Sequence, residues 1–120
     1  MPDRAALLRA VGEGVVADLS RTLARATETD DPRADLRAAV IAYRAFVLRN
    51  PNGYRLLFAD LPPGAAPDPA SVAALGEPIV RAMARLAGGS VALEAARTLV
   101  SWAHGFVSME LAGAFRLGGD

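Results

Sequence analysis

The stretch Arg97–Phe115, with the sequence RTLVSWAHGFVSMELAGAF, decides the fold of this 120-residue chain. Its apolar side chains recur every three or four residues, which is the repeat of an α-helix. One apolar stripe holds Trp102, Phe106, Met109 and Gly113, and a second holds Leu93, Ala96, Val100, Ala103, Val107 and Ala114. Together they cover more than half of the helix circumference, which exceeds one buried face of a surface helix. We therefore expect this helix to lie at the centre of a core or to be shared with a partner chain.

The same spacing predicts an all-α fold of about five helices in a single domain spanning residues 1–120. The expected helices span residues 3–26, 32–49, 52–60 and 69–87, and the body of the last one spans residues 93–115. Asp31-Pro32 and Asp68-Pro69 are helix-start signatures, because an acidic side chain caps the first amides and proline fits the first helical position. Only a few residues join the last two helices, so we expect them to run antiparallel.

Two of these helices contain residues that weaken a helix. Gly12 and Gly14 in the first helix each cost about 1 kcal/mol relative to alanine, so we expect a kink or a close contact there. Pro78 falls inside the fourth helix and is expected to kink it or to divide it after Glu77. Ser90 is the expected cap of the last helix.

Composition argues against several classes of function. Thirteen basic residues, all arginine, balance thirteen acidic ones, and this zero net charge argues against a dedicated nucleic-acid surface. The chain has no cysteine and no signal-peptide pattern at its start, so we expect a cytoplasmic protein. Thr98–Phe115 approaches the length of a membrane span, but His104 and Glu110 within it favour a soluble helix. A sole histidine without cysteine predicts no metal site, and we expect no cofactor.

Two sequence blocks carry a resemblance to a known family. The first is Trp102–Leu111, WAHGFVSMEL, and the second combines Tyr43–Phe46, YRAF, with Asn50–Phe58, NPNGYRLLF. In this order and at this separation they resemble the WHG-type C-terminal domain of TetR-family transcriptional regulators. The resemblance covers nearly all of the chain. Intact members begin with a helix-turn-helix DNA-binding domain, and nothing in these 120 residues corresponds to it.

The resemblance implies a homodimer in which the last two helices of each chain form a four-helix bundle across a two-fold axis. Ser101, Gly105, Ser108 and Ala112 recur at spacings of four, three and four, and such small side chains let another helix approach closely. The expected dimer interface comprises Val72, Leu75, Ile79, Ser101, His104, Gly105, Ser108 and Ala112.

The resemblance also implies a cavity for a small, mostly apolar effector. The expected lining residues are Tyr43, Phe46, Tyr54, Phe58, Met83, Trp102, Phe106, Met109 and Glu110. Spacing alone makes these residues plain core. Glu110 stands in an apolar sector, and a carboxylate there needs a partner. It is either paired with Arg44 or Arg55, or it is a polar anchor for the effector.

Two functional readings from different classes remain at this point. The favoured one is the ligand-sensing and dimerising domain of a TetR-like repressor, which cannot bind DNA without its missing head. The alternative is a headless helical module that pairs with an intact regulator through the same face. Ser101 and Ser108 stand one helical turn from His104, but no glycine-rich elbow or oxyanion loop accompanies them, so we predict no catalytic site.

Overall fold

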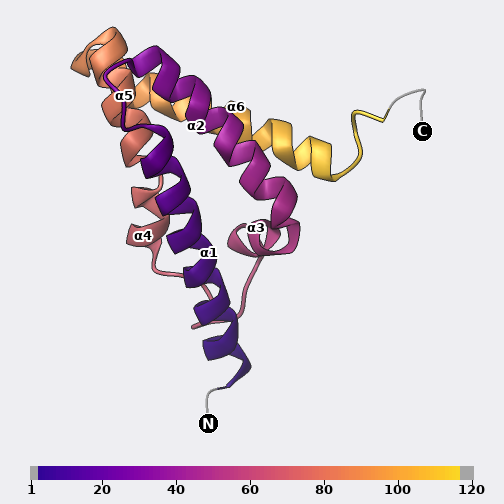
Figure 1. Ribbon diagram of the computed structural model, residues 1–120. Coiled ribbons are helices and arrows are strands. Elements are labelled where there is room, and N and C mark those ends of the chain that lie inside the picture. The colour runs from indigo at the N-terminus through magenta and orange to yellow at the C-terminus, as the bar shows by residue number, and fades with distance from the viewer. Residues whose placement is uncertain (1–2, 117–120) are drawn as a thin grey trace.

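The computed structural model describes residues 3–116 and is all-α within that range (Figure 1). Its helices are α1 (Arg4–Ala26), α2 (Pro32–Arg49), α3 (Pro51–Leu57), α4 (Pro69–Ala74), α5 (Glu77–Ala87) and α6 (Gly89–Leu111). Both predicted acid-proline starts are confirmed. The Asp31 carboxylate accepts from the amides of Arg33 and Ala34, and Asp68 accepts from the amide of Ala70 at 3.0 Å.

The region expected to form the fourth helix forms two. The break falls at Leu75 and Gly76, just before Glu77, and Pro78 lies in the first turn of α5. Proline costs nothing in a first turn because those amides have no intrahelical acceptor, whereas it would disrupt the interior of a continuous helix. The expected cap at Ser90 was wrong. Gly88 precedes α6 instead, with a φ of 94° that favours glycine.

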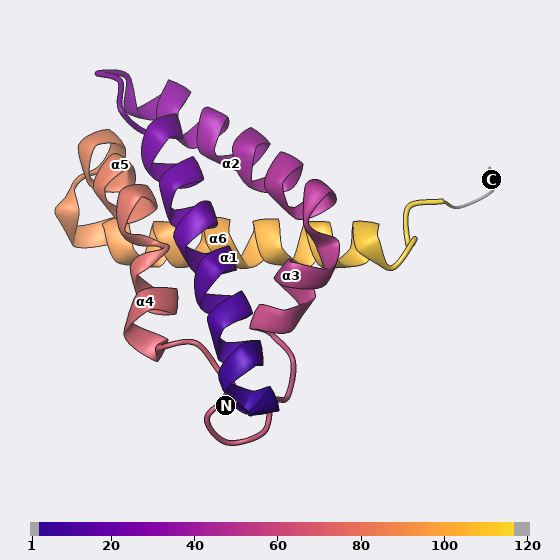
Figure 2. The same cartoon turned by 60° about the horizontal axis from the view of Figure 1, so that its bottom comes forward.

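Two helices, α2 and α6, organise the packing. Figure 1 shows α1 and α2 folding back on each other, while α6 passes behind α2. Figure 2 shows α6 running across behind α1, with the described end of the chain beyond α3. The predicted reversal between α5 and α6 is present, and the two helices make the most extensive contact in the fold. They cross obliquely in both views, so α5 covers only the first part of α6.

The core is formed where α1, α2, α5 and α6 meet. Its buried members are Leu19, Leu23, Leu36, Ala39, Phe46, Ile79, Ala82 and Ala96. A smaller cluster of Val47, Tyr54 and Val107 joins α2, α3 and the second half of α6. Alanines at the contacts let the helix axes approach closely, since a small side chain leaves the neighbouring backbone room.

A close contact explains Gly12. A Cβ atom at this position would lie 2.9 Å from the Cγ atom of Pro67, which belongs to the connection between α3 and α4. Gly14 has open space at the corresponding point. The close contact predicted for this part of α1 is therefore confirmed at Gly12, and it holds the proline-rich connection against α1.

A buried carboxylate links the other end of the bundle. Asp35 on α2 is 1% exposed, and it accepts hydrogen bonds from the amide and hydroxyl of Thr29 in the α1–α2 connection. Its second oxygen has no hydrogen-bond partner and faces Arg85 of α5 at 3.7 Å. Because Arg85 also donates to the Thr29 carbonyl at 3.2 Å, one side chain joins this connection to α5.

The molecule measures 48 × 41 × 22 Å, so it is only about two helix diameters thick. A body this thin leaves one side of α6 uncovered, and Trp102, Phe106, Met109 and Phe115 are exposed there. Across residues 3–116, every helix is too short or too polar to span a lipid bilayer.

Candidate ligand-binding site

An aromatic cluster stands where α3 meets α2 and α6. Proline at the start of α3 ends the preceding helix, and the next turn directs Tyr54 inward, where it is 2% exposed. Its ring lies 5.8 Å from that of Tyr43 on α2 and 5.6 Å from that of His104 on α6. Phe58 packs on the outer side of His104 with ring centroids 4.2 Å apart. Three separate helices therefore meet at the Tyr54 side chain.

A hydrogen-bond chain runs through this cluster. The Tyr43 hydroxyl bonds to that of Tyr54, which in turn bonds to Nδ1 of His104. Burial, and then the hydrogen bond to Tyr54, raise the pKa of Tyr43 far above its ordinary value of 10.0. Burial also raises the pKa of Tyr54, although the bond from Tyr43 acts in the opposite direction. Both phenols therefore stay protonated and available as donors at neutral pH.

A shallow pocket of about 260 Å³, here called the Trp102 pocket, lies between α2 and α6. It is lined by Val40, Tyr43, Arg44, Trp102, Ala103, Phe106 and Val107. Its walls are mostly aliphatic and aromatic, and the Trp102 and Phe106 rings stand 5.6 Å apart. The pocket suits apolar contact, with the Tyr43 hydroxyl and the Arg44 guanidinium as its polar groups.

A second shallow pocket of about 240 Å³, here called the His104 pocket, lies between α3 and the end of α6. It is lined by Tyr54, Arg55, Phe58, His104, Ser108, Leu111 and Ala112. Tyr43 lines the Trp102 pocket, whereas Tyr54 and His104 line this one. The hydrogen-bond chain therefore connects the two pockets through the protein.

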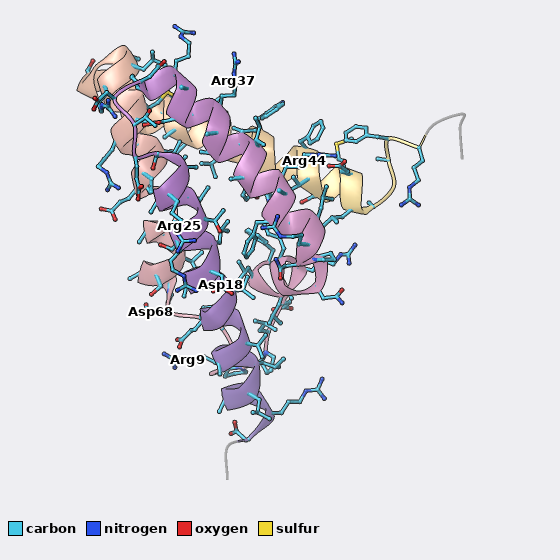
Figure 3. All side chains as sticks on the ribbon, viewed as in Figure 1. Arg9, Asp18, Arg25, Arg37, Arg44 and Asp68 are labelled. Carbon is cyan, nitrogen blue, oxygen red and sulfur yellow. The ribbon has the colours of Figure 1, made fainter. Side chains whose placement is uncertain are left out.

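Glu110 pairs with Arg44 at the edge of the Trp102 pocket. The guanidinium donates from Nε to Oε1 at 2.9 Å and from Nη2 to Oε2 at 2.5 Å. Figure 3 labels Arg44 where α2 passes over α6. The Arg44 hydrogen bonds lower the pKa of Glu110, against the opposing effect of burial. Of the two hypotheses for Glu110, an arginine partner or a polar anchor for the effector, the structure contains the arginine pair. It lies at the surface, however, with the Glu110 side chain 24% exposed.

The predicted lining residues divide among several places. Tyr43, Trp102 and Phe106 line one pocket, and Tyr54 and Phe58 line the other. The remaining four line neither pocket: Phe46 is in the core, Met83 packs against the core from α5, Met109 is exposed, and Glu110 pairs with Arg44.

The predicted interface residues also divide. Ile79 is 5% exposed inside the core and forms no outward face, whereas Leu75 is partly buried and packs against the core. His104 and Ser108 line the His104 pocket. The outward positions are Val72, Ser101, Gly105 and Ala112, all at least partly exposed, and a Cβ atom at Gly105 would meet nothing within 4 Å.

Sequence reasoning missed part of both pockets. Val40, Ala103, Val107 and Leu111 line them, and Arg55 lines the His104 pocket although it had been considered only as a partner for Glu110. Helical spacing contains part of this signal, because Ala103, Val107 and Leu111 follow one another at intervals of four residues. In residues 3–116 no three histidine, cysteine, aspartate or glutamate side chains gather as metal ligands would.

Comparison with known families agrees with this architecture. Residues 36–120 match the family model described as "Tetracyclin repressor-like, C-terminal domain". The match begins within α2 and extends through α6, so it includes both pockets. No curated protein and no solved structure matches the chain. Because the matched region covers well over half of its length, the chain belongs to the TetR-like C-terminal domain family, a family of regulator domains.

Proposed function

We propose that this chain is the effector-binding and dimerising domain of a cytoplasmic TetR-like repressor. The observation that carries the proposal is the pair of pockets joined by the Tyr43–Tyr54–His104 hydrogen-bond chain. An apolar wall with a few converging polar groups is typical of small-molecule sites. DNA recognition belongs, in this proposal, to a separate segment of the regulator, because this chain has no net positive charge for binding phosphate.

Effector action follows from where the pockets lie. Each pocket has α6 as one wall and α2 or α3 as the other, so an occupant changes how α6 stands against the rest of the domain. A ligand shifts a conformational equilibrium only by its different affinity for the two states. The effector would therefore favour the arrangement in which two DNA-binding heads no longer fit adjacent half-sites.

The proposed dimer uses the uncovered side of α6. Ser101, Gly105 and Ala112 leave room for a second helix, and the exposed Trp102 and Met109 side chains supply apolar area beside them. This surface replaces the predicted contribution of Ile79, whose side chain is used within the protomer.

Sedimentation equilibrium at micromolar concentration tests the dimer. We expect a dimer for the wild type and a folded monomer for Gly105→Arg, because arginine fills the space a second helix needs. Gly14→Arg is the matched control, since Gly14 is likewise a helical glycine whose Cβ position has nothing within 4 Å. A wild-type monomer, or a Gly105→Arg variant that still dimerises, contradicts the proposed interface.

Titration with small aromatic compounds tests effector binding. Benzamide, phenol and indole are added to the isotope-labelled chain, and its amide signals are followed by NMR. We expect at least one of them to shift signals around Trp102 or His104. If none of these compounds, nor benzoate, shifts those signals, the effector-binding half of the proposal is contradicted.

The exposed apolar side of α6 also supports a second candidate, a module that pairs with an intact regulator instead of with itself. This candidate predicts weak self-association in the sedimentation experiment. A catalytic role is not proposed, because the hydrogen-bond partner of His104 is the Tyr54 phenol and not a serine or a carboxylate.

A further inference from the structure

The charge at the edge of each pocket differs between the two pockets. Arg44 at the Trp102 pocket is neutralised by its two hydrogen bonds to Glu110. Arg55 at the His104 pocket has no such partner, and the ion pairs among residues 3–116 do not include it. Its contacts are a 3.4 Å bond to the Asn52 side chain and a 3.5 Å bond to the Leu111 carbonyl. Both are long and therefore weak, so the guanidinium is available to a ligand.

The polar groups of the His104 pocket are donors. A tyrosine hydroxyl has one proton, so when Tyr43 donates its own to Tyr54, the Tyr54 proton goes to Nδ1 of His104. In the neutral ring the proton is then on Nε2, which becomes a donor. Ser108 adds a hydroxyl, and no carboxylate lines the pocket. A site that presents a cation and an imidazole N–H fits a negatively charged acceptor.

The rest of the pocket fits a flat apolar group. Phe58 is 57% exposed although it packs on His104, so one face of its ring is free for stacking. The volume of about 240 Å³ lies below the range of roughly 300–1,000 Å³ usual for drug-sized ligands, which favours a single ring.

We propose that the His104 pocket selects a small aromatic carboxylate, held by Arg55 and Nε2 of His104 with its ring against Phe58. This inference rests on the proposed function and deepens it by naming the effector class. The carboxylate accepts from the guanidinium and from the imidazole N–H, and these charge-assisted bonds are stronger than those of a neutral amide. The Trp102 pocket binds no anion, because its arginine, Arg44, is already paired with Glu110.

Benzoate and benzamide provide the test, because they share a shape and differ in charge. Their dissociation constants are measured by NMR titration of the full chain at low ionic strength. We expect benzoate to bind at least about tenfold more tightly than benzamide, a difference of about 1.4 kcal/mol. We expect Arg55→Gln to remove this preference by weakening benzoate alone. The control Arg49→Gln removes an equal charge from an exposed residue that lines neither pocket, and it should leave both constants unchanged.

Four results would overturn the proposal: equal binding of the two compounds, an unchanged benzoate constant in Arg55→Gln, signal changes confined to the Trp102 pocket, or no benzoate binding at millimolar concentration. In all but the last of these an aromatic compound binds, so effector binding survives. The proposed function fails separately, when benzamide, phenol, indole and benzoate all leave the spectrum unchanged. The single histidine gives a second readout, since its ring nitrogens should report the Nε2–H tautomer in the wild type and lose that preference in Tyr54→Phe.

Discussion

His104 shows how one side chain can join several elements. Its Nδ1 atom is hydrogen-bonded to Tyr54 of α3, and its ring packs against that of Phe58, the residue that follows α3. The His104 side chain also lines the His104 pocket. A lone histidine on a helix is often explained as packing alone, but here a hydrogen bond and two aromatic contacts together hold the ring.

The Tyr43 phenol predicts alkaline sensitivity. Because its pKa is raised in the folded chain, its stabilising effect is complete below the unfolded value of 10.0 and is lost as the pH rises beyond that toward the folded pKa. Above pH 10, the free energy of unfolding of Tyr43→Phe should fall less steeply with pH than that of the wild type. At neutral pH the variant should be less stable by about 1 kcal/mol, because it lacks the hydrogen bond. Urea unfolding at several pH values measures both effects. A wild type and a variant with the same alkaline slope would contradict this account.

The Arg44–Glu110 pair predicts that the fold loses stability in acid. Arg44 lowers the pKa of Glu110 in the folded chain, so the pair stabilises the fold above the unfolded pKa and loses its effect as the pH falls through the folded value. Thermal unfolding of Glu110→Gln should show a lower Tm than the wild type at pH 7 and no difference in strong acid. Glu94→Gln is the control, because its carboxylate is 81% exposed beside Arg97. A Glu110→Gln variant with wild-type Tm at pH 7 would rule out a stabilising pair.

Among the elements, α1 provides a matched pair of glycines. Gly12→Ala places a methyl group 2.9 Å from Pro67, whose ring cannot turn aside, and should destabilise the fold by roughly 1–3 kcal/mol. Gly14→Ala meets only open space and should stabilise it by roughly 0.5–1 kcal/mol through helix propensity. Urea unfolding of the two variants measures the change in the free energy of unfolding for each, and we expect opposite signs. Two changes of the same sign would show that contact with Pro67 does not distinguish these positions.

The elements also show what sequence could and could not predict. Capping chemistry is local, so Asp31-Pro32 and Asp68-Pro69 placed two helix starts correctly. Pro78 also predicted a division of the fourth helix, and the break lies just before Glu77, at Leu75 and Gly76. The start of α6 at Gly89 was missed, because Gly88 and not Ser90 precedes the helix. Helical spacing identified Ile79 as apolar but could not say that its side chain is buried in the protomer's own core. The same limit applies to the site: its aromatic residues were predicted as one cavity, but the contact between α2 and α6 divides them between two.

At the scale of the whole molecule, the connection between α3 and α4 has the composition of a loose linker but is packed against the rest of the domain. Rich in proline and flanked by exposed residues, it looks like a protease-sensitive linker. Yet Ala65 is fully buried and Pro67 packs on Gly12. A protease must draw an extended segment of the chain into its cleft, and burial of that segment prevents this whatever its composition. Limited digestion of the native chain should therefore leave the α3–α4 connection intact, while Gly12→Ala should open it to cleavage. The connection is thus a built part of the domain, and cutting the gene there would not yield two independent fragments.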